Sequence, residues 1–250
     1  MQKMLGYVRK ACQEFDMIQD GDRIAVGISG GKDSLVLLNA LAGYRRFCPQ
    51  KFDLVAITLD PQFGGVSTDF SSVSEMCRGL GVEYDLIPTD IGQIVFDIRK
   101  EPNPCSLCAK LRRGALHDAA IKHGCNKIAL GHHNDDAIET FIMNLFREGR
   151  VGCFAPVTYL SRKDITMIRP MVFAPEQQVI SCCNRNGFQV VKSKCPADHT
   201  TVRQETKDWL AEMERKDKGF KIRIFGALRR SGVNGWGFKS ENTEQDKEQL

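Results

Sequence analysis

The sequence lacks any apolar run long enough to span a membrane, which takes about 20 residues, and residues 1–7 lack the apolar core of a signal peptide. We therefore expect no transmembrane helix and a cytoplasmic protein. The sequence also has little excess charge, because 35 Lys and Arg residues face 31 Asp and Glu residues, a net charge of +4. Such a balance does not by itself indicate nucleic-acid binding. No internal repeat is present, and 250 residues suit one α/β domain with an appendage or two small domains.

Cysteine, by contrast, is abundant, with 10 residues. Disulfides rarely persist in the cytosol, so this number favours metal or redox chemistry over a disulfide framework. Several cysteines occur singly in helical or apolar stretches, where a free thiol packs as a small apolar group; these are Cys12, Cys48, Cys77 and Cys125. The sequence assigns no role to Cys153, Cys182 and Cys183.

Short apolar runs without alternation occupy residues 24–28, 53–59 and 127–130, with a weaker run at 84–88. Such runs are typical of buried parallel strands. Helical patterns separate or flank them, at residues 1–18, 33–46, 70–80, 106–123, 134–146, 174–186 and 201–216. The alternation predicts the α/β class, a doubly wound parallel sheet with helical N- and C-terminal extensions. In such a sheet ligands bind at the carboxyl ends of the strands.

The first motif follows the 24–28 run directly and reads Ser29-Gly30-Gly31-Lys32-Asp33-Ser34. Its two glycines allow a sharp turn and a close approach of the backbone to an anion. Successive N–H groups, the N-terminus of the next helix and two hydroxyls can then face phosphate oxygens. Lys32 adds positive charge, and Asp33 could hold Mg²⁺ on the phosphates. The spacing is not that of a Walker loop, and an ordinary strand–helix turn is the alternative interpretation.

The second motif is Cys105-Ser106-Leu107-Cys108, followed by the basic residues Lys110, Arg112 and Arg113. Cysteines at i and i+3 put both sulfurs on one side of a turn, and nearby positive charge favours thiolates. Alone, the motif fits a redox pair, half of a zinc site or half of an iron–sulfur site. Cys195, in a polar loop, is the third candidate ligand. Three thiolates without a clear fourth suit a [4Fe–4S] cluster with one open iron, with His199 as a less favoured fourth ligand.

The third motif, Gly131-His132-His133-Asn134-Asp135-Asp136, ends the 127–130 run and is expected at the same sheet edge as the first. Asp135 and Asp136 can hold Mg²⁺ or move protons, although capping and the helix dipole also favour acidic residues there. For His132 we favour a site role over a buried structural one. Asp60, after the 53–59 run, could contact the ribose or a metal, with turn formation before Pro61 as the alternative.

Together with Ile168-Arg169-Pro170, these motifs closely resemble the TtcA family of tRNA 2-thiocytidine synthetases, which are PP-loop ATP pyrophosphatases. The similarity covers residues 20–215, roughly, in matching order and spacing. The resemblance implies an ATP-binding PP-loop domain and an oxygen-labile [4Fe–4S] cluster on Cys105, Cys108 and Cys195. It also implies sulfur transfer to cytidine 32 of the tRNA anticodon loop, with Asp33 assisting Mg²⁺ and Asp136 beside the reacting nucleotide.

Two departures from related families bear on the target base. Arg112 stands where 2-thiouridine synthetases usually carry a catalytic Lys, and their zinc-ribbon cysteines are absent here, which favours the cytidine branch. Many members of the family have two cysteines near the third ligand position, whereas Cys195 stands alone. The expected division of the chain is an N-terminal helix, a PP-loop domain carrying the Cys105 motif, a C-terminal segment and a disordered tail, at residues 1–20, 21–190, 191–238 and 239–250.

The predicted catalytic residues are Lys32, Asp33, Arg112 and Asp136, and the predicted nucleotide contacts are Ser29, Gly30, Gly31, Lys32, Asp33, Ser34, Asp60, Gly131 and Asp135. Expected partners are tRNA and a cysteine desulfurase or another sulfur donor, with a homodimer as one assembly. Cations expected to contact RNA are Lys110, Arg112, Arg113, Arg147, Arg150, Lys216, Lys218, Lys221, Arg223, Arg229 and Arg230.

In the predicted reaction, the C2 oxygen of the base attacks the α-phosphate of ATP, and sulfur then displaces AMP. The sulfur is carried on the open iron or, alternatively, as a cysteine persulfide. Three rival functions stay open at this point. They are thiolation of a tRNA uridine, adenylation by a cluster-free enzyme of lysidine-synthase or amidating type, and nucleotide binding by a zinc-stabilised module without catalysis.

Overall fold

The computed structural model describes residues 1–100, 104–197 and 202–237. Within them, one sheet has the strand order β3-β2-β1-β4-β6-β5, and its strands are β1 (Asp22–Gly27), β2 (Phe52–Asp60), β3 (Glu83–Pro88), β4 (Lys127–Ala129), β5 (Val157–Leu160) and β6 (Ile165–Ile168). All neighbours are parallel except β5 and β6. The chain moves outward from β1 first towards β3 and later towards β6, which confirms the predicted doubly wound parallel sheet.

The α-helices of the described segments are α1 (Gln2–Glu14), α2 (Lys32–Arg45), α3 (Ser71–Leu80), α4 (Ile91–Gln93), α5 (Pro104–Lys122), α6 (Asn134–Arg147), α7 (Glu176–Arg185), α8 (Val202–Lys216) and α9 (Phe220–Ser231). Short 3₁₀ turns lie at η1 (Phe63–Gly65) and η3 (Val233–Gly235), and η2 (Ile94–Arg99) is a π-helix. Every helix expected from the sequence is present within a few residues. The predicted tail at 239–250 lies outside the described residues.

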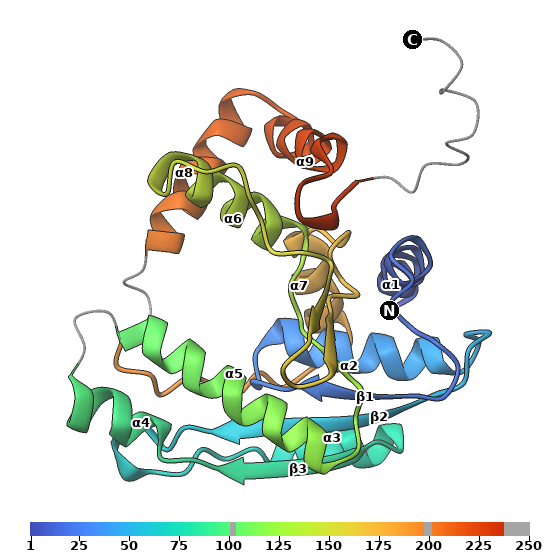
Figure 1. Cartoon of the computed structure of the whole chain (residues 1–250), viewed down its shortest axis with the longest axis vertical. Helices are drawn as coiled ribbons and strands as arrows, with labels where there is room; N and C mark the ends of the chain where they lie inside the picture. Colours follow the sequence, from blue (N-terminus) through green and yellow to red (C-terminus); the bar gives the residue numbers. More distant parts are fainter. Residues whose placement is uncertain (101–103, 198–201, 238–250) are drawn as a thin grey trace.

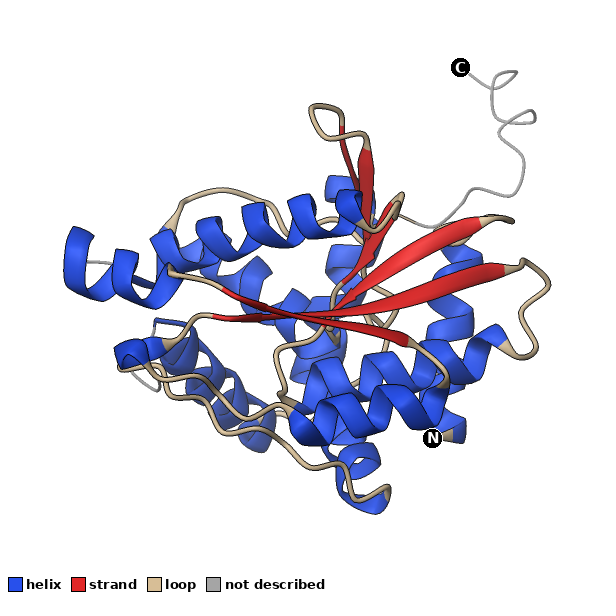
Figure 2. Cartoon of the chain, turned by 90° about the horizontal axis from the view of Figure 1, so that it is seen from below, coloured by secondary structure: helices blue, strands red, loops and turns tan. Residues whose placement is uncertain are grey.

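Helices cover both faces of the sheet, as Figure 2 shows. Successive side chains of a strand point to opposite faces, so Ile24 and Val26 of β1 join one core whereas Ala25 joins another. The first core packs the sheet against α1, α2, α3 and α7, and the second packs it against α5. Helix α5 therefore covers the second face of the sheet, near the ends of β1 and β2.

The C-terminal helices form a separate layer beside α6 (Figure 1). Ile138 and Ile142 of α6 pack with Leu210 of α8, and Phe220 and Ile224 of α9 pack against them. Sequence analysis did not predict α9, because the basic residues between its apolar positions mask their helical spacing. No helix in the described ranges is long and apolar enough to cross a membrane.

Strands are added to one side of β1 first and to the other side later, so the order of the strands reverses between β1 and β4. These two parallel strands lie side by side in the centre of the sheet. Loops that leave neighbouring strands on opposite sides open a crevice at their carboxyl ends. The loop after β1 carries the first sequence motif, and the loop after β4 carries the third. The fold therefore brings the two motifs to one edge, as predicted.

Candidate functional site: a phosphate loop facing a cysteine-bearing helix

The loop after β1 folds back onto the N-terminus of α2. The Ser34 hydroxyl donates to the carbonyl oxygen of Gly31 at 2.9 Å, and the backbone N–H of Ser29 donates to the Ser34 hydroxyl at 3.2 Å. Gly30 has φ +80°, and a Cβ there would lie 2.7 Å from the Cβ of Val191. Only glycine meets both conditions. The loop thus has the sharp turn that the sequence predicts, with amides at a helix N-terminus.

Gly131 brings the loop after β4 against residues 29–34, the phosphate loop. A Cβ on Gly131 would lie 3.1 Å from the carbonyl carbon of Asp33 and 3.2 Å from the backbone nitrogen of Ser34. Cβ atoms rarely lie this close to other atoms, and here the neighbouring atoms belong to the backbone, which cannot easily move aside. The absence of a side chain at Gly131 therefore lets the two loops touch.

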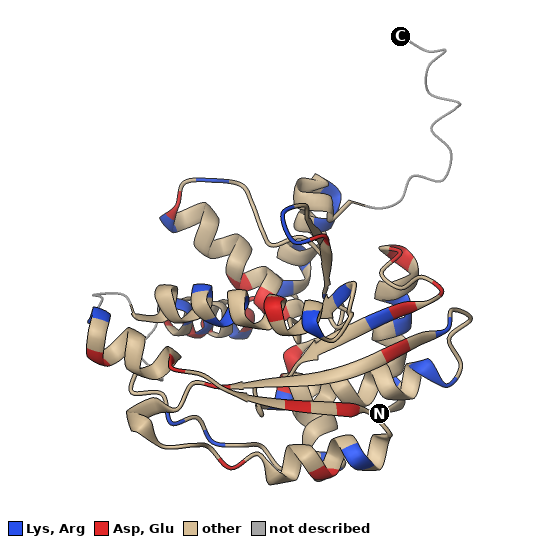
Figure 3. Ribbon diagram, turned by 60° about the horizontal axis from the view of Figure 1, so that its bottom comes forward, with Lys and Arg blue, Asp and Glu red and all other residues tan. Residues whose placement is uncertain are grey.

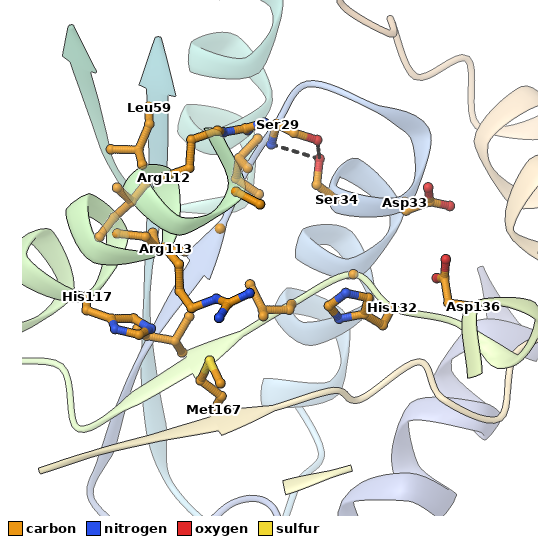
Figure 4. Close-up of a pocket in the computed structure, with 18 residues that line it drawn as sticks. Ser29, Asp33, Ser34, Leu59, Arg112, Arg113, His117, His132, Asp136 and Met167 are labelled. Carbon is orange, nitrogen blue, oxygen red and sulfur yellow. Dashed lines mark hydrogen bonds between the residues drawn. The ribbon is translucent and has the colours of Figure 1, made fainter. Parts of the chain in front are cut away.

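Two carboxylates flank His133 at this junction. The Nδ1 of His133 accepts from the backbone N–H of Asp136 at 3.3 Å, and the Asp136 carboxylate accepts from the His133 backbone N–H at 2.9 Å. This reciprocal cap starts α6 and fixes Asp136. The Nε2 of His133 lies 3.7 Å from the Asp33 carboxylate. Figure 4 shows Asp33 and Asp136 facing the same space at one end of the site. Sequence reasoning gave His133 no role, although its place before Asp136 was a capping signal.

A pocket of about 420 Å³ opens beside the phosphate loop (Figure 4). One wall is the loop itself with Ser29, Asp33 and Ser34, and Asp136 closes one end. The opposite wall is α5, which contributes Arg112 and Arg113. The base of the pocket consists of apolar strand residues, among them Ile57, Leu59, Ile128 and Met167. The pocket thus joins the first, second and third motifs, because α5 is the helix that begins with Cys105 and Cys108.

His132 lines the pocket as a neutral side chain. Burial, followed by the charge of Arg169, lowers its pKa to about 4. Its ring lies 4.9 Å from the ring of Phe154, and its Nδ1 is buried without a hydrogen-bond partner among the described residues. The pKa of His117, also in the pocket wall, is lowered mainly by burial and then by Arg113. The predicted site role of His132 stays a prediction, but its place in the wall is compatible with it.

The cysteines divide into two groups by exposure. All ten lie within the described residues, and seven are buried: Cys12, Cys48, Cys77, Cys125, Cys153, Cys182 and Cys183. The three that are not buried are Cys105, Cys108 and Cys195, the three predicted as ligands. Burial raises the pKa of Cys77 to about 11 and that of Cys153 to about 12, so these two thiols are kept protonated. The interpretation of Cys12, Cys48, Cys77 and Cys125 as packing residues is therefore confirmed.

The charges of both other accessible thiols reach Cys108. Burial raises the pKa of Cys108, Arg112 opposes this, and the charges of Cys195 and Cys105 raise it further. Sequence analysis expected the basic residues to lower the thiol pKa. For Cys108 the predicted net direction was wrong: its pKa is raised, because the effect of burial exceeds the opposing effect of Arg112. In the described part of the chain, no three His, Cys, Asp or Glu side chains stand at metal-binding spacing, so these three thiols do not form a closed site there.

Asp60 and Asp135 have partners other than the pocket. Both carboxylate oxygens of Asp60 accept backbone N–H groups of its own turn, from Gln62 at 3.1 Å and Thr68 at 2.9 Å. The Asp135 carboxylate accepts from Lys221 at 2.9 Å and from the backbone N–H of Glu176 at 2.7 Å. Neither aspartate is among the described residues that line the pocket. Their nucleotide contacts stay predictions, and the geometry gives each a structural role.

A chain of ion pairs links the phosphate loop to α8. Lys32 is not among the described residues that line the pocket, and its Nζ lies 3.0 Å from the Asp33 carboxylate and 3.2 Å from Glu176. Lys207 of α8 contacts the same Glu176 at 2.7 Å. Burial alone would raise the pKa of Glu176, but the hydrogen bond and charge of Lys207, together with Lys32, lower it to about 2. Glu176 is therefore ionised, and no sequence motif had pointed to it or to Lys207.

The cations predicted to contact RNA have different environments. Lys110 and Arg113 are exposed on α5 beside the pocket. Arg229, however, is buried: its guanidinium pairs with Glu14 and donates to the carbonyl oxygen of Trp236 at 3.0 Å. Its predicted RNA contact is wrong, because its charge is used inside the fold. Figure 3 shows Lys and Arg spread over most elements in that view.

Comparisons with known proteins agree with this geometry. The family model for the PP-loop domain matches residues 4–212. A tRNA-cytidine(32) 2-sulfurtransferase from Geobacter sulfurreducens is 39% identical over 229 residues, covering 90% of this chain and 88% of that protein. One from Citrifermentans bemidjiense is 40% identical over 225 residues, covering 88% and 87%.

A solved structure of a tRNA thiolase has a similar fold. The U34-tRNA thiolase NcsA from Methanococcus maripaludis, determined with its [4Fe–4S] cluster, matches with a TM-score of 0.72 and 27% identity, covering 89% of this chain and 76% of that one. The chain belongs to the PP-loop family and, within it, to the tRNA-cytidine(32) 2-sulfurtransferases.

Proposed function

We propose that this protein uses ATP to replace the C2 oxygen of cytidine 32 in tRNA with sulfur. One observation carries the proposal: α5 carries Cys105 and Cys108 at its start and, one to two turns later, lines the same pocket as the phosphate loop with Arg112 and Arg113. The phosphate loop and the helix that carries a pair of accessible thiols thus line one cavity, whose volume is in the range of small-molecule sites.

ATP would bind with its pyrophosphate on the amides of residues 29–34 and the N-terminus of α2. Asp33 and Asp136 offer carboxylate oxygens for Mg²⁺, which prefers oxygen ligands. His133 holds both in place, through the cap on Asp136 and its proximity to Asp33. The apolar base of the pocket, with Ile57 and Met167, suits a nucleobase.

The reaction begins when the C2 oxygen of the cytosine attacks the α-phosphorus of ATP, and pyrophosphate leaves. The loop amides face the negative charge that develops on the pyrophosphate, and Lys32 and Arg112 add positive charge beside it. The product is an adenylated base. In the second step a bond forms between C2 and sulfur, the bond between C2 and the adenylated oxygen breaks, and AMP leaves. The neutral His132 keeps the pocket wall free of an additional cation.

Cys105, Cys108 and Cys195 would hold a [4Fe–4S] cluster. The fit rests on their being the three cysteines that are not buried and on the charges of Cys105 and Cys195 both acting on Cys108. Thiolates are the usual ligands of such clusters, and three of them leave one iron open, where the cluster would supply sulfur.

The target is a cytidine in this proposal because the relatives named for cytidine 32 are 39–40% identical, against 27% for the uridine thiolase. The tRNA would be held mainly through its phosphates by exposed cations such as Lys110 and Arg113. A sulfur-donor protein and a homodimer belong to the proposal as partners.

The test uses the full chain prepared without oxygen, with ATP, Mg²⁺, sulfide and unmodified tRNA. Mass spectrometry of tRNA digests should find 2-thiocytidine at position 32, dependent on ATP, and none with Asp33→Ala. Thiolated uridine would reassign the target. Pyrophosphate release without any thiolated base would leave an adenylating enzyme with another acceptor.

A further inference from the structure

Glu176 is shared between two lysines that come from different parts of the fold. The Nζ of Lys32, in the phosphate loop, and the Nζ of Lys207, on α8, contact the same oxygen, Oε1, at 3.2 and 2.7 Å. The Glu176 side chain is 14% exposed, whereas Lys32 is 29% and Lys207 is 37% exposed. The carboxylate is thus the more enclosed partner, and solvent screens its effect on Lys32 only in part.

The charges around Glu176 affect how much positive charge the phosphate loop presents. The Nζ of Lys32 also contacts the Asp33 carboxylate at 3.0 Å, so Lys32, Asp33, Glu176 and Lys207 together carry no net charge. Without Lys207 the sum is −1, because Glu176 then has Lys32 as its remaining counter-ion. The shorter contact belongs to Lys207, so Lys207 is the main counter-ion of Glu176. The charge of Lys32 is therefore more available to a polyanion bound at residues 29–34 when Lys207 is in place.

The position of Lys207 in the chain gives this arrangement a consequence. Helix α8 follows the segment that carries Cys195, and it reaches the site at two points: Lys207 contacts Glu176, and Arg203 lies 3.4 Å from Asp136. Docking of α8 thus places a cation beside the phosphate loop and another beside a pocket carboxylate. A C-terminal segment that is not docked would provide neither.

We propose that Lys207 is a positioning residue for ATP binding. By neutralising Glu176, Lys207 makes the affinity of the phosphate loop for the triphosphate depend on the docking of α8, the helix after Cys195. The proposal rests on the proposed ATP-dependent function and deepens it. It links the segment that carries the third cysteine to the nucleotide site through a single carboxylate.

The experiment is a double-mutant cycle on the full chain, with the dissociation constant of Mg²⁺ and a non-hydrolysable ATP analogue measured by calorimetry. Lys207→Ala should weaken binding by roughly fivefold, the order expected when one partly screened charge is lost. Glu176→Gln alone should leave binding equal to or tighter than that of the wild type. The double variant, which again has the net charge of the wild type, should return to wild-type affinity.

Lys216→Ala on the same helix is the matched control, because Lys216 pairs with Glu212 in an exposed contact. Lys207→Arg should bind as the wild type does, and Lys207→Met replaces the alanine variant if that one unfolds. A merely structural role for Lys207 predicts that the double variant binds no better than Lys207→Ala, and this result would overturn the proposal. Equal affinities of Lys207→Ala and Lys216→Ala would also overturn it. Failure of the wild type itself to bind the analogue would instead refute the ATP-dependent function.

Discussion

The indole Nε1 of Trp236 donates to the carbonyl oxygen of Phe154 at 2.6 Å. Trp236 is fully buried, and the ring of Phe154 lies against His132 in the pocket wall. The last described residues of the chain thus hold Phe154, whose ring packs against His132 of the pocket wall. Arg229 completes this anchor by donating to the Trp236 carbonyl oxygen.

Replacing Trp236 should therefore destabilise the protein strongly. We expect Trp236→Ala to lower the free energy of unfolding by about 3–5 kcal/mol, as is usual for a buried aromatic residue. Trp236→Phe keeps most of the packing but leaves the Phe154 carbonyl oxygen unpaired, at a cost of about 1–3 kcal/mol. Urea unfolding followed by circular dichroism measures both. A smaller loss for Trp236→Ala than for Trp236→Phe would contradict the anchoring role.

A methyl group at Gly131 should damage the nucleotide site more than the fold. Gly131→Ala places a Cβ 3.1–3.2 Å from the backbone of Asp33 and Ser34, so the phosphate loop must shift. Displacement of catalytic groups by about 1 Å costs on the order of 10²-fold in rate, and we expect a loss of that size in 2-thiocytidine formation. Gly79→Ala is the control, because a Cβ at Gly79 meets nothing within 4 Å. Equal activity of the two variants would show that the loops can separate freely.

The site was predictable from the sequence to the extent that it depends on strand ends. Ser29–Ser34 and Gly131–Asp136 each follow an apolar run, and parallel strands end at one edge, so their proximity followed from local patterns. The contacts of Glu176 with Lys32 and Lys207 could not be predicted this way, because they join three elements without a motif. The burial of Arg229 depends on Glu14, 215 residues away, and the basic residues around it looked like a solvated surface.

Glu139 should make stability depend on pH. Burial, followed by the charge of Asp136, raises the pKa of Glu139 from 4.5 to about 7. The folded state then holds its proton more tightly than the unfolded state, so this group lowers stability as pH rises from about 4.5 to about 7. Glu139→Gln should be more stable than the wild type by about 1–3 kcal/mol at pH 8 and equal to it at pH 4.

Chemical denaturation of both proteins at the two pH values measures this difference, and subtraction removes the contributions of other groups. Glu212→Gln serves as the control of opposite sign: the hydrogen bond and the charge of Lys216 lower the pKa of this exposed carboxyl group, so the variant should show no gain in stability at pH 8 over pH 4. A gain for Glu139→Gln that is the same at pH 4 and pH 8 would mean that the carboxyl group is not protonated in the folded protein near neutral pH.

Iron content distinguishes the accessible cysteines from the buried ones. Protein purified without oxygen should contain about four irons per chain, and Cys195→Ala should lose them. Cys77→Ala removes a buried thiol from the core and should keep the iron, with a modest loss of stability. Iron and sulfide analysis, with the visible spectrum, gives the answer. Zinc in place of iron, or iron retained in Cys195→Ala, would exclude the proposed ligand set.

Replacing an exposed cation near the pocket should affect tRNA binding, whereas replacing a buried cation should affect the stability of the fold. Lys110 is exposed on α5 beside the pocket, so Lys110→Ala should weaken tRNA binding and reduce the slope of log K against log salt by about 1. Lys51 directly precedes β2, at the opposite end of the strands from the pocket. Its replacement by Ala should have no effect on tRNA binding. Arg229→Ala should lower the stability of the fold, because the half-buried Glu14 loses its counter-ion, while the salt slope stays unchanged. A reduced slope for Arg229→Ala in folded protein would place this residue on the RNA surface after all.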